Sequence, residues 1–450
     1  IYYSHSMANV IKLQKGLDIV MKGKAACEKK TVKAPDKYAL VPDDFCGLKP
    51  KVVVREGDVV KAGDALFVDK LHPEVQYCSP VSGKVVAVTR GDRRKLLNVT
   101  VESDGKGESV DFGKKAPKSL SGAEVKECLM KAGLFGFFRS RPYDVVANPE
   151  DEPKAIFVSA LQDMPLAQDF EFVLKGQEAD FQTGLDALAR IAPVNLGVGT
   201  KQNISANGVN VYAFDGKCPA GNVGVQINHI SPINKGEVVW TMGAEEVIMV
   251  GRLFNKGVLD MTRTIAVGGE CVKAPAYAEV KVGQCICTLV KECVSEGNVR
   301  LIGGNALTGR KLANPDFLPA HATELTAIPE GDDNHEMLGW IMPRFNQFSA
   351  SRTYFSWLLG KKAYSFDSRV KGGERHMIMS GEYDRVFPMD IYPEQLVKAI
   401  IAGDIDRMEA LGIYEVAPED FALCEFVCSS KVEVQRIVRE GLDMLRKEMA

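Results

Sequence analysis

The stretch that most constrains the fold of this chain is residues 52–88, which reads as two similar halves. The first half places turn glycines at Gly57 and Gly63, each followed by an aspartate, between short runs of β-branched residues. The second half opens at Ser79, turns at Gly83 and continues in valines. Glycine adopts turn dihedrals that other residues resist, and valine suits pleated, half-buried strands. Short strands at this spacing predict a small, flattened β-barrel.

The pattern G-D-x-V-x-x-G-D-x-L, followed by S-P-x-x-G-x-V, resembles the lipoyl/biotinyl barrel-sandwich fold. Carriers of that fold hold a modified lysine at the tip of the hairpin that joins the two halves, and Lys70 is the candidate here. Lys70 follows Leu66 by only four residues, whereas a longer and uneven segment, residues 71–78, comes after it. Lys70 is therefore out of register with the hairpin tip. We interpret the barrel as structural, with a carrier modified at Lys70 as an alternative.

The composition of the chain limits its class. Its 450 residues exceed one ordinary core, so two to four domains are expected. The net charge of -3 gives no electrostatic case for nucleic acid. No run of about eighteen apolar residues could span a bilayer, and the N-terminus lacks a charged-then-apolar signal pattern, which indicates the cytoplasm. Residues 1–6 resemble an expression remnant or misassigned codons, with Met7 as the start.

The eleven cysteines and six histidines predict no metal site. The cysteines are scattered without a C-x-x-C pair, so buried reduced thiols are expected in a cytosolic chain. Cys285 and Cys287 alternate along an expected strand, where we interpret them as a pair of small apolar residues on one face. The histidines form no H-E-x-x-H or comparable spacing.

The middle of the chain alternates strand and helix patterns, which predicts a Rossmann-like parallel sheet. A capping box at Ser121 and Glu124 begins its first helix. Further helices are expected over residues 178–190, 219–230 and 244–254, and strands over residues 154–161, 193–198, 209–214 and 236–242. The segment up to residue 48 is loop-rich and is expected to fold against the barrel.

After Arg263 the pattern changes to short strands, and the end of the chain reads as helical. A compact, mostly β unit is expected, with strands at residues 264–267, 278–282, 285–290 and 299–302. An aromatic, irregular stretch follows over residues 337–359. Helices are then expected over residues 393–402, 404–411, 418–428 and 431–447.

Several stretches together resemble the A subunit of the sodium-translocating NADH:quinone oxidoreductase of bacteria. They are I-K-L-Q-K-G-L-D-I at residues 11–19, residues 134–144 with R-x-R-P, V-G-R-L-F at residues 250–254, and E-D-F-A-L-C-E-F-V-C-S-S-K at residues 419–431. The tail is the most specific match, and the resemblance extends over essentially the whole chain from Met7. The order of domains is also similar to the NADH-binding flavin subunit of respiratory complex I and to the soluble subunit of Rnf-type complexes.

The resemblance implies a multidomain α/β protein. The expected units are an N-terminal segment plus barrel-sandwich hybrid (7–118), a Rossmann-like domain (119–258), a β-grasp (SLBB-like) domain (259–330), and an aromatic segment with a helical C-terminal domain (331–450).

Two departures from those relatives bear on cofactors. The relatives have a glycine-rich loop, whose bare N–H groups bind a flavin phosphate, where this chain has Phe135, Phe137, Phe138 and Arg139. Bulky side chains there would block the phosphate. The relatives also carry a cysteine cluster for a four-iron centre, which needs four thiolates, whereas only two cysteines remain here, at 424 and 428. We therefore expect no redox cofactor in this chain, with NADH, flavins and iron–sulfur bound by partner subunits.

The motif Gly243-Ala244-Glu245-Glu246 is similar to the acidic turn that contacts NADH in complex I. The alternative interpretation is that acidic residues are favoured in the first turn of a helix.

As implied by the resemblance, the chain is a peripheral subunit on the cytoplasmic face of the bacterial inner membrane. It would bind membrane and soluble subunits of a complex that couples NADH oxidation and quinone reduction to Na⁺ export. No catalytic residue is expected in it, and its role would be that of a scaffold that contributes to a quinone site. The candidate quinone or partner contacts are Phe135, Phe137, Phe138, Arg139, Arg141, Trp340, Phe345 and Phe348. Core packing is the alternative role for these residues, and an independent flavin- or NADH-binding oxidoreductase is the alternative function.

Overall fold

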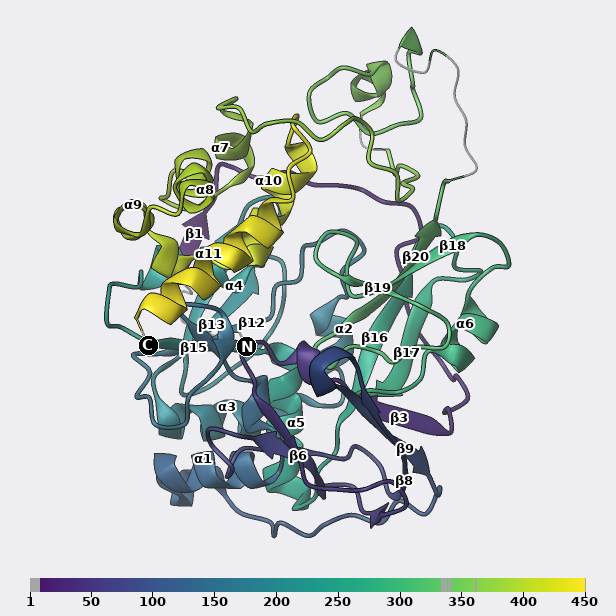
Figure 1. Ribbon diagram of the computed structural model, residues 1–450, viewed down its shortest axis with the longest axis vertical. Helices are drawn as coiled ribbons and strands as arrows, with labels where there is room; N and C mark the ends of the chain where they lie inside the picture. The colour runs from purple at the N-terminus through teal and green to yellow at the C-terminus, as the bar shows by residue number, and fades with distance from the viewer. Residues whose placement is uncertain (1–8, 333–337, 339–340, 361, 450) are drawn as a thin grey trace, which may run out of the picture.

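The computed structural model describes residues 9–332, 338, 341–360 and 362–449. Its described strands form four sheets of seven, six, four and three strands. Figure 1 shows the barrel at the lower end, the seven-stranded sheet and the six-stranded sheet above it on either side, and the C-terminal helices α7 to α11 at the upper left. The expected multidomain α/β fold is confirmed in all four of its parts.

The barrel is built from the four-stranded and the three-stranded sheets, in the orders β3-β9-β8-β5 and β4-β6-β7. Its strands are β3 Lys37–Leu40, β4 Pro50–Val52, β5 Val59–Val60, β6 Ala65–Asp69, β7 Gln76–Cys78, β8 Gly83–Arg90 and β9 Leu96–Ser103. Lys70 is the first residue after β6, and its backbone N–H donates to the carbonyl of Lys49 at 2.7 Å. The lysine therefore lies at the base of the β6–β7 loop and not at its tip.

The seven-stranded sheet has the order β1-β14-β13-β12-β15-β10-β11. The strands β1, β14, β13, β12 and β15 are parallel, which confirms the Rossmann-like prediction, whereas β10 and β11 add an antiparallel edge. The strands are β1 Asn9–Lys12, β10 Arg139–Arg141, β11 Val145–Val146, β12 Ile156–Ser159, β13 Val194–Gly199, β14 Asn210–Asp215 and β15 Val239–Gly243.

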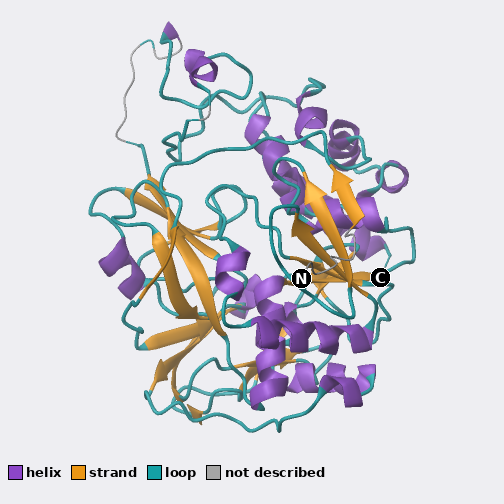
Figure 2. Ribbon diagram, turned by 180° about the vertical axis from the view of Figure 1, so that it is seen from behind, coloured by secondary structure: helices purple, strands orange, loops and turns teal. Residues whose placement is uncertain are grey.

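The helices of this domain are α1 Gly122–Lys131, α2 Phe170–Leu174, α3 Glu178–Ile191, α4 Val223–Ile230 and α5 Ala244–Lys256. The predicted capping box of Ser121 and Glu124 begins α1. Figures 1 and 2 show α1, α3 and α5 side by side below the sheet. A glycine is required at 251 on α5, because a Cβ there would lie 1.7 Å from the carbonyl oxygen of Asp180 on α3.

The six-stranded sheet has the order β19-β18-β20-β16-β17-β2 and forms the β-grasp-like unit. Its elements are β2 Ala26–Lys30, β16 Thr262–Gly268, β17 Ala276–Lys281, α6 Cys287–Cys293, β18 Val299–Gly303, β19 Arg310–Leu312 and β20 Glu324–Pro329. The strand expected over residues 285–290 is wrong, because α6 occupies most of that stretch. Leu289 and Cys293 are buried whereas Lys291 between them is exposed, which fits the period of a helix and not the alternation of a strand, where all three would share a face. Cys285 and Cys287 therefore do not share the face of a strand.

The N-terminal segment was expected to fold against the barrel. It also supplies a strand to each of the two large sheets. β1 pairs in parallel with β14 at the edge of the seven-stranded sheet, and β2 pairs in parallel with β17 at the edge of the six-stranded sheet. Each added strand satisfies backbone N–H and C=O groups that an edge strand would otherwise expose.

The C-terminal region contains α7 Glu382–Val386, α8 Pro393–Ala402, α9 Ile405–Ala410, α10 Ala422–Val427 and α11 Val434–Glu448. This confirms the predicted helical end, although residues 418–421 form a separate 3₁₀ turn before α10. Among the described residues, the structure contains no helix with both the length and the apolar composition needed to cross a bilayer.

Candidate functional site

The aromatic residues at 135–138 lie inside the protein, in what we call the junction segment (residues 135–139). Phe135, Phe137 and Phe138 are each no more than 2% exposed. The rings of Phe135 and Phe138 pack on Trp240 of β15, with centroids 5.5 and 5.2 Å apart. The ring of Phe137 packs on Phe45, 5.6 Å away and just after the first barrel strand. The segment thus joins the barrel to the Rossmann-like sheet.

The junction segment leaves no space for a flavin phosphate at its backbone. A Cβ at Gly136 would lie 2.4 Å from Cε1 of Tyr77, a barrel residue, so even this glycine is covered by a ring. A phosphate would have to displace that ring or the three buried phenylalanines to reach the N–H groups. The residues present therefore do not fit the flavin phosphate that the glycine-rich loop of the relatives binds.

Arg141, the second arginine of R-x-R-P, is buried in a charged cluster that ties β10 to the C-terminal region. Its guanidinium lies 2.9 Å from a carboxylate oxygen of Glu419, 3.3 Å from Asp420 and 3.8 Å from Asp144. Burial alone would raise the pKa of Asp144, but the guanidiniums of Arg139 and Arg141 outweigh burial and lower it. Arg139 is half-exposed and lies 3.8 Å from Asp144. Arg141 therefore connects β10 directly to residues 419–420 of the C-terminal region.

The acidic pair Glu245 and Glu246 also faces inward. Both residues are 4% exposed, and both lie against the buried Arg263 of β16, at 3.3 and 2.7 Å respectively. Burial raises the pKa of Glu245 to about 8. Burial would do the same to Glu246, but Arg263 and His321 outweigh it and lower its pKa to about 2. These carboxylates connect the N-terminus of α5 to the β-grasp sheet, because both contact the Arg263 guanidinium.

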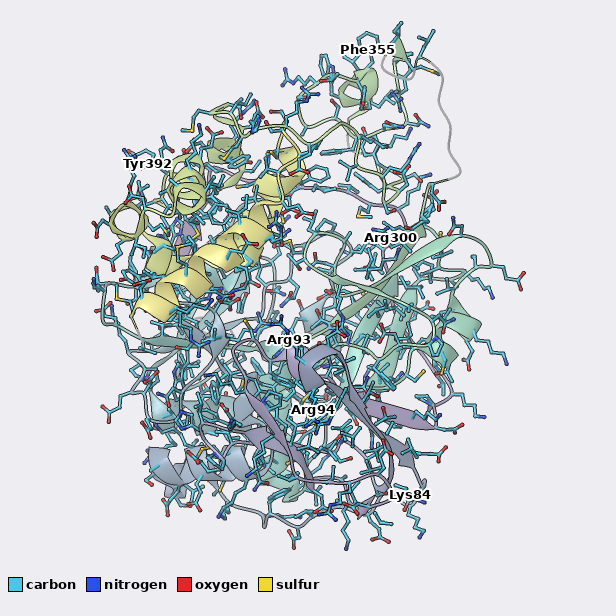
Figure 3. The ribbon with its side chains drawn as sticks, viewed as in Figure 1. Lys84, Arg93, Arg94, Arg300, Phe355 and Tyr392 are labelled. Carbon is cyan, nitrogen blue, oxygen red and sulfur yellow. The ribbon has the colours of Figure 1, made fainter. Side chains whose placement is uncertain are left out.

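Two further predicted residues, Phe345 and Phe348, lie in what we call the apical segment (residues 341–360), at the far end of the molecule (Figure 1). Phe345 is 48% exposed, whereas Phe348 is half-buried and lines a cavity below. Figure 3 places Phe355 at the outer end of this segment and Arg300 on the sheet beneath it. Trp340 lies outside the described residues.

A cavity of about 830 Å³ lies between the apical segment, the β-grasp sheet and the C-terminal helices. Its walls come from distant parts of the chain: Ile19 and Met21 near the N-terminus, Ile302 on β18, Ile328 on β20, Phe426 on α10 and Gln435 on α11. Sites of this size that bind small organic molecules have mainly apolar walls with a few polar groups.

Phe348 lines the cavity together with the rings of Tyr354, Phe366 and Phe426, and Tyr364 packs on Phe348 outside the lining. The Phe348 ring lies 5.6 Å from Tyr364, 6.0 Å from Phe366 and 5.9 Å from Phe426, measured between centroids. Three of these four side chains were not predicted as site residues. Their assembly depends on contacts between segments far apart in the chain, and the sequence offers only one signal, the position of Phe426 inside the specific tail motif.

Polar groups lie at the edge of the same cavity. The Oε1 atom of Gln347 is buried without a hydrogen-bond partner among the described residues. The Nε of Arg300 donates to Glu330 at 2.9 Å, and this hydrogen bond lowers the pKa of Glu330 to about 2. Burial raises the pKa of Glu425, whose carboxylate accepts the backbone N–H of Gln435 at 2.9 Å. The cavity therefore combines aromatic walls with amide, guanidinium and carboxyl groups.

Within the described ranges, no group of three or more His, Cys, Asp or Glu side chains is placed to hold a metal ion. Cys424 and Cys428 are both buried, and the Tyr383 hydroxyl donates to the sulfur of Cys428 at 3.0 Å.

Three models of domains from one protein family match the chain. They are the NqrA N-terminal barrel-sandwich hybrid domain over residues 11–104, the NqrA second alpha/beta domain over residues 120–259, and the NQRA C-terminal domain over residues 264–314.

Full-length relatives match as well. The NqrA subunit of the Na(+)-translocating NADH-quinone reductase of Haemophilus influenzae strain Rd is 37% identical over 449 residues, which cover 98% of this chain and 100% of that protein. The corresponding subunit from Alcanivorax borkumensis is 37% identical over 451 residues with the same coverage, and that of Actinobacillus pleuropneumoniae serotype 5b is 36% identical over 451 residues, again with the same coverage.

Among solved structures, the NAD⁺-reducing [NiFe]-hydrogenase in the H2-reduced state matches 74% of this chain and 62% of the hydrogenase chain. The identity is 13% and the TM-score is 0.36, so this likeness carries no argument about function.

Proposed function

This chain belongs to the NqrA family, the A subunits of the Na⁺-translocating NADH-quinone reductases, and we propose that it acts there as a scaffold and contributes to a quinone site. As a subunit of such a reductase it takes part in coupling NADH oxidation and quinone reduction to Na⁺ export. We place it as a peripheral subunit on the cytoplasmic face of the bacterial inner membrane, bound to the membrane and soluble subunits of the same complex.

The observation that carries the quinone proposal is the cavity below the apical segment. Its volume of about 830 Å³ matches that of small-molecule sites, and its aromatic wall suits a flat quinone ring, which stacks on or packs edge-to-face against aromatic side chains. Of the candidate contacts, Phe348 has this position, and we propose it as the central quinone contact. Polar side chains at the edge, including Gln347, supply groups that can hydrogen-bond the quinone carbonyls.

The remaining candidates support the scaffold role. Phe135, Phe137 and Phe138 pack domains together, and Arg141 holds the C-terminal region through Glu419 and Asp420. A quinone would reach them only by displacing core residues. Phe345 and the half-exposed Arg139 are accessible, so we propose them as contacts with a partner.

We further propose that the flavins, iron–sulfur centres and NADH site of the reductase belong to its other subunits. The filled space at the junction segment supports this for flavin. The alternative of an independent flavin- or NADH-binding oxidoreductase needs carboxylates free to meet the nucleotide, whereas Glu245 and Glu246 are buried against Arg263. A purified chain that carries flavin or binds NADH would restore that alternative.

The test of the quinone proposal uses the assembled complex with Phe348→Ala in this chain. We expect the quinone KM of NADH-driven reduction to rise about tenfold, because an aromatic contact and its buried area are lost. Tyr392→Ala is the matched control, since Tyr392 is 65% exposed at the start of α8 and does not line the cavity. An unchanged KM in Phe348→Ala, Phe366→Ala and Phe426→Ala alike would leave the scaffold role only.

The test of the broader role is deletion of the chain in its host. We expect sodium-dependent quinone reduction with NADH in membranes to be lost. Unchanged sodium-dependent activity would remove the proposed participation in this reaction.

A further inference from the structure

The outer surface of the apical segment is unusually apolar for an exposed part of a protein. Seven large apolar side chains within these 20 residues are each between 46% and 61% exposed. They are Ile341, Met342, Phe345, Phe355, Trp357, Leu358 and Leu359. Two of them, Phe345 and Phe355, pack on each other with ring centroids 5.9 Å apart. Exposed apolar side chains gathered in this way are typical of an interaction site.

The charges of the apical segment have a single sign. It contains Arg344 and Arg352 and no Asp or Glu, although the whole chain carries a net charge of -3. Both guanidiniums lie over aromatic rings, Arg344 over Tyr354 at 5.5 Å and Arg352 over Trp357 at 5.2 Å. Positive charge is therefore held beside the exposed aromatic side chains, which is the combination that favours a negatively charged partner with an apolar layer beneath its charges.

The shape of the segment favours a bilayer over a protein as that partner. The segment lies at one end of the longest axis of the molecule, and Phe355 lies at its outer end (Figure 3). Its backbone is mostly irregular and includes the short 3₁₀ helix Phe355–Leu359. Such a backbone cannot enter hydrocarbon, but its apolar side chains can reach the boundary between headgroups and acyl chains.

We propose that the apical segment docks this chain on the surface of a bilayer that contains anionic phospholipid. The apolar side chains enter the interface, while Arg344 and Arg352 contact headgroup phosphates. The inference deepens the proposed peripheral association, and rests on it, by naming the surface and the lipid class. The inner side of the same segment lines the cavity, through residues 347–351 and residues 353–354, so docking would hold the cavity next to the phase in which quinones dissolve.

The test is sedimentation of the full chain with vesicles of phosphatidylglycerol and phosphatidylethanolamine, compared with vesicles of phosphatidylcholine. We expect binding to the anionic vesicles only, and weaker binding at high salt. Trp357→Ser and Leu358→Ser should each weaken it about tenfold, and Arg352→Gln about fivefold. Val59→Ser is the matched control, because Val59 is 79% exposed on the barrel, outside the apical segment. An unchanged melting temperature shows that each variant is folded.

Equal binding to both kinds of vesicle, or no binding to either, would overturn the lipid proposal, as would unchanged affinity in the apical variants. If vesicles are not bound but Trp357→Ser releases the chain from the assembled complex, the surface contacts a protein partner in that complex and not lipid. In that case the scaffold role stands. If release of the chain from the complex has no effect on quinone reduction, that result contradicts the proposed function itself.

Discussion

The junction segment and the apical segment have similar compositions and opposite environments. Both combine phenylalanines with arginine, and the sequence makes both of them candidate quinone or partner contacts. In the structure, Phe138 is fully buried against Trp240, whereas Phe355 is 51% exposed at the end of the molecule. Aromatic composition alone therefore does not identify a contact site, because burial leaves only one of these two segments accessible to another molecule.

The largest expected difference between the two segments is the effect of removing one ring. Phe138→Ala should lower the free energy of unfolding by about 3–5 kcal/mol, because it leaves a cavity between β15 and the junction segment. Phe355→Ala should change it by no more than about 0.5 kcal/mol, because the ring is half-exposed. Urea denaturation of the full chain measures both. Similar losses in the two variants would show that the apical segment is part of the core.

A smaller effect is expected from adding a methyl group. Gly136→Ala places a Cβ 2.4 Å from Tyr77, so the tyrosine ring has to move, at a cost of about 1–3 kcal/mol. The control is Gly373→Ala, where a Cβ would meet no atom within 4 Å. The same denaturation experiment compares the two. A neutral Gly136→Ala would mean that the junction segment is less tightly packed than the structure indicates.

The charges next to the junction segment predict a pH dependence of stability. His321 contacts the Phe137 ring, at 5.2 Å between centroids, and lies 3.8 Å from Glu246. Burial raises the pKa of the neighbouring Glu245 from 4.5 to about 8. Between pH 4.5 and about 8, the folded state therefore holds a proton on Glu245 that the unfolded state has released. The contribution of Glu245 to the free energy of unfolding is therefore fully present below pH 4.5 and is lost as the pH rises through about 8.

Glu245→Gln should remove this fall in the free energy of unfolding, which denaturation at a series of pH values between about 5 and 8 would measure. Glu246→Gln is the contrasting variant. Its carboxylate has a pKa lowered to about 2, so its contribution is present above 4.5 and is lost only as the pH falls toward 2. Glu246→Gln should therefore lower stability near neutral pH, and the slope should be weakened but not removed, because burial still raises the pKa of Glu245 after the Glu246 charge is gone. A slope that persists in Glu245→Gln would contradict the assignment.

The smallest expected effect concerns the apical arginines. Arg352→Gln removes a cation from the Trp357 ring at an exposed position, where such contacts contribute about 0.5–1 kcal/mol. The melting temperature should therefore change little, even though vesicle binding falls. A large drop in melting temperature would show that Arg352 supports the fold and not a contact.

Much of the fold was predictable because local patterns determined it. The glycine and valine spacing predicted the barrel, the alternation of strand and helix predicted the parallel sheet, and the Ser121 capping box predicted the start of α1. The short apolar run at residues 285–290 was assigned to a strand and is largely helical, because a run of that length fits either period.

Long-range pairing was not predictable from the same patterns. β1 and β2 precede the barrel in sequence but pair with the edges of two other sheets. The partner of such a strand depends on which sheet edge remains open after the rest of the chain has folded. The candidate site illustrates the same limit. Phe348 was predicted, but Phe366 and Phe426 join it in the cavity lining only through contacts between distant segments.

The central claim is that this protein meets its surroundings through the apical segment and the cavity below it, while the junction segment serves as core. Hydrogen–deuterium exchange tests this most directly when the isolated chain is compared with the chain in the complex, assembled in a bilayer with anionic lipid. We expect exchange to slow over residues 341–360 on assembly, and to remain slow and unchanged over residues 135–139. Unchanged exchange in the apical segment, or a change confined to the junction segment, would contradict the account.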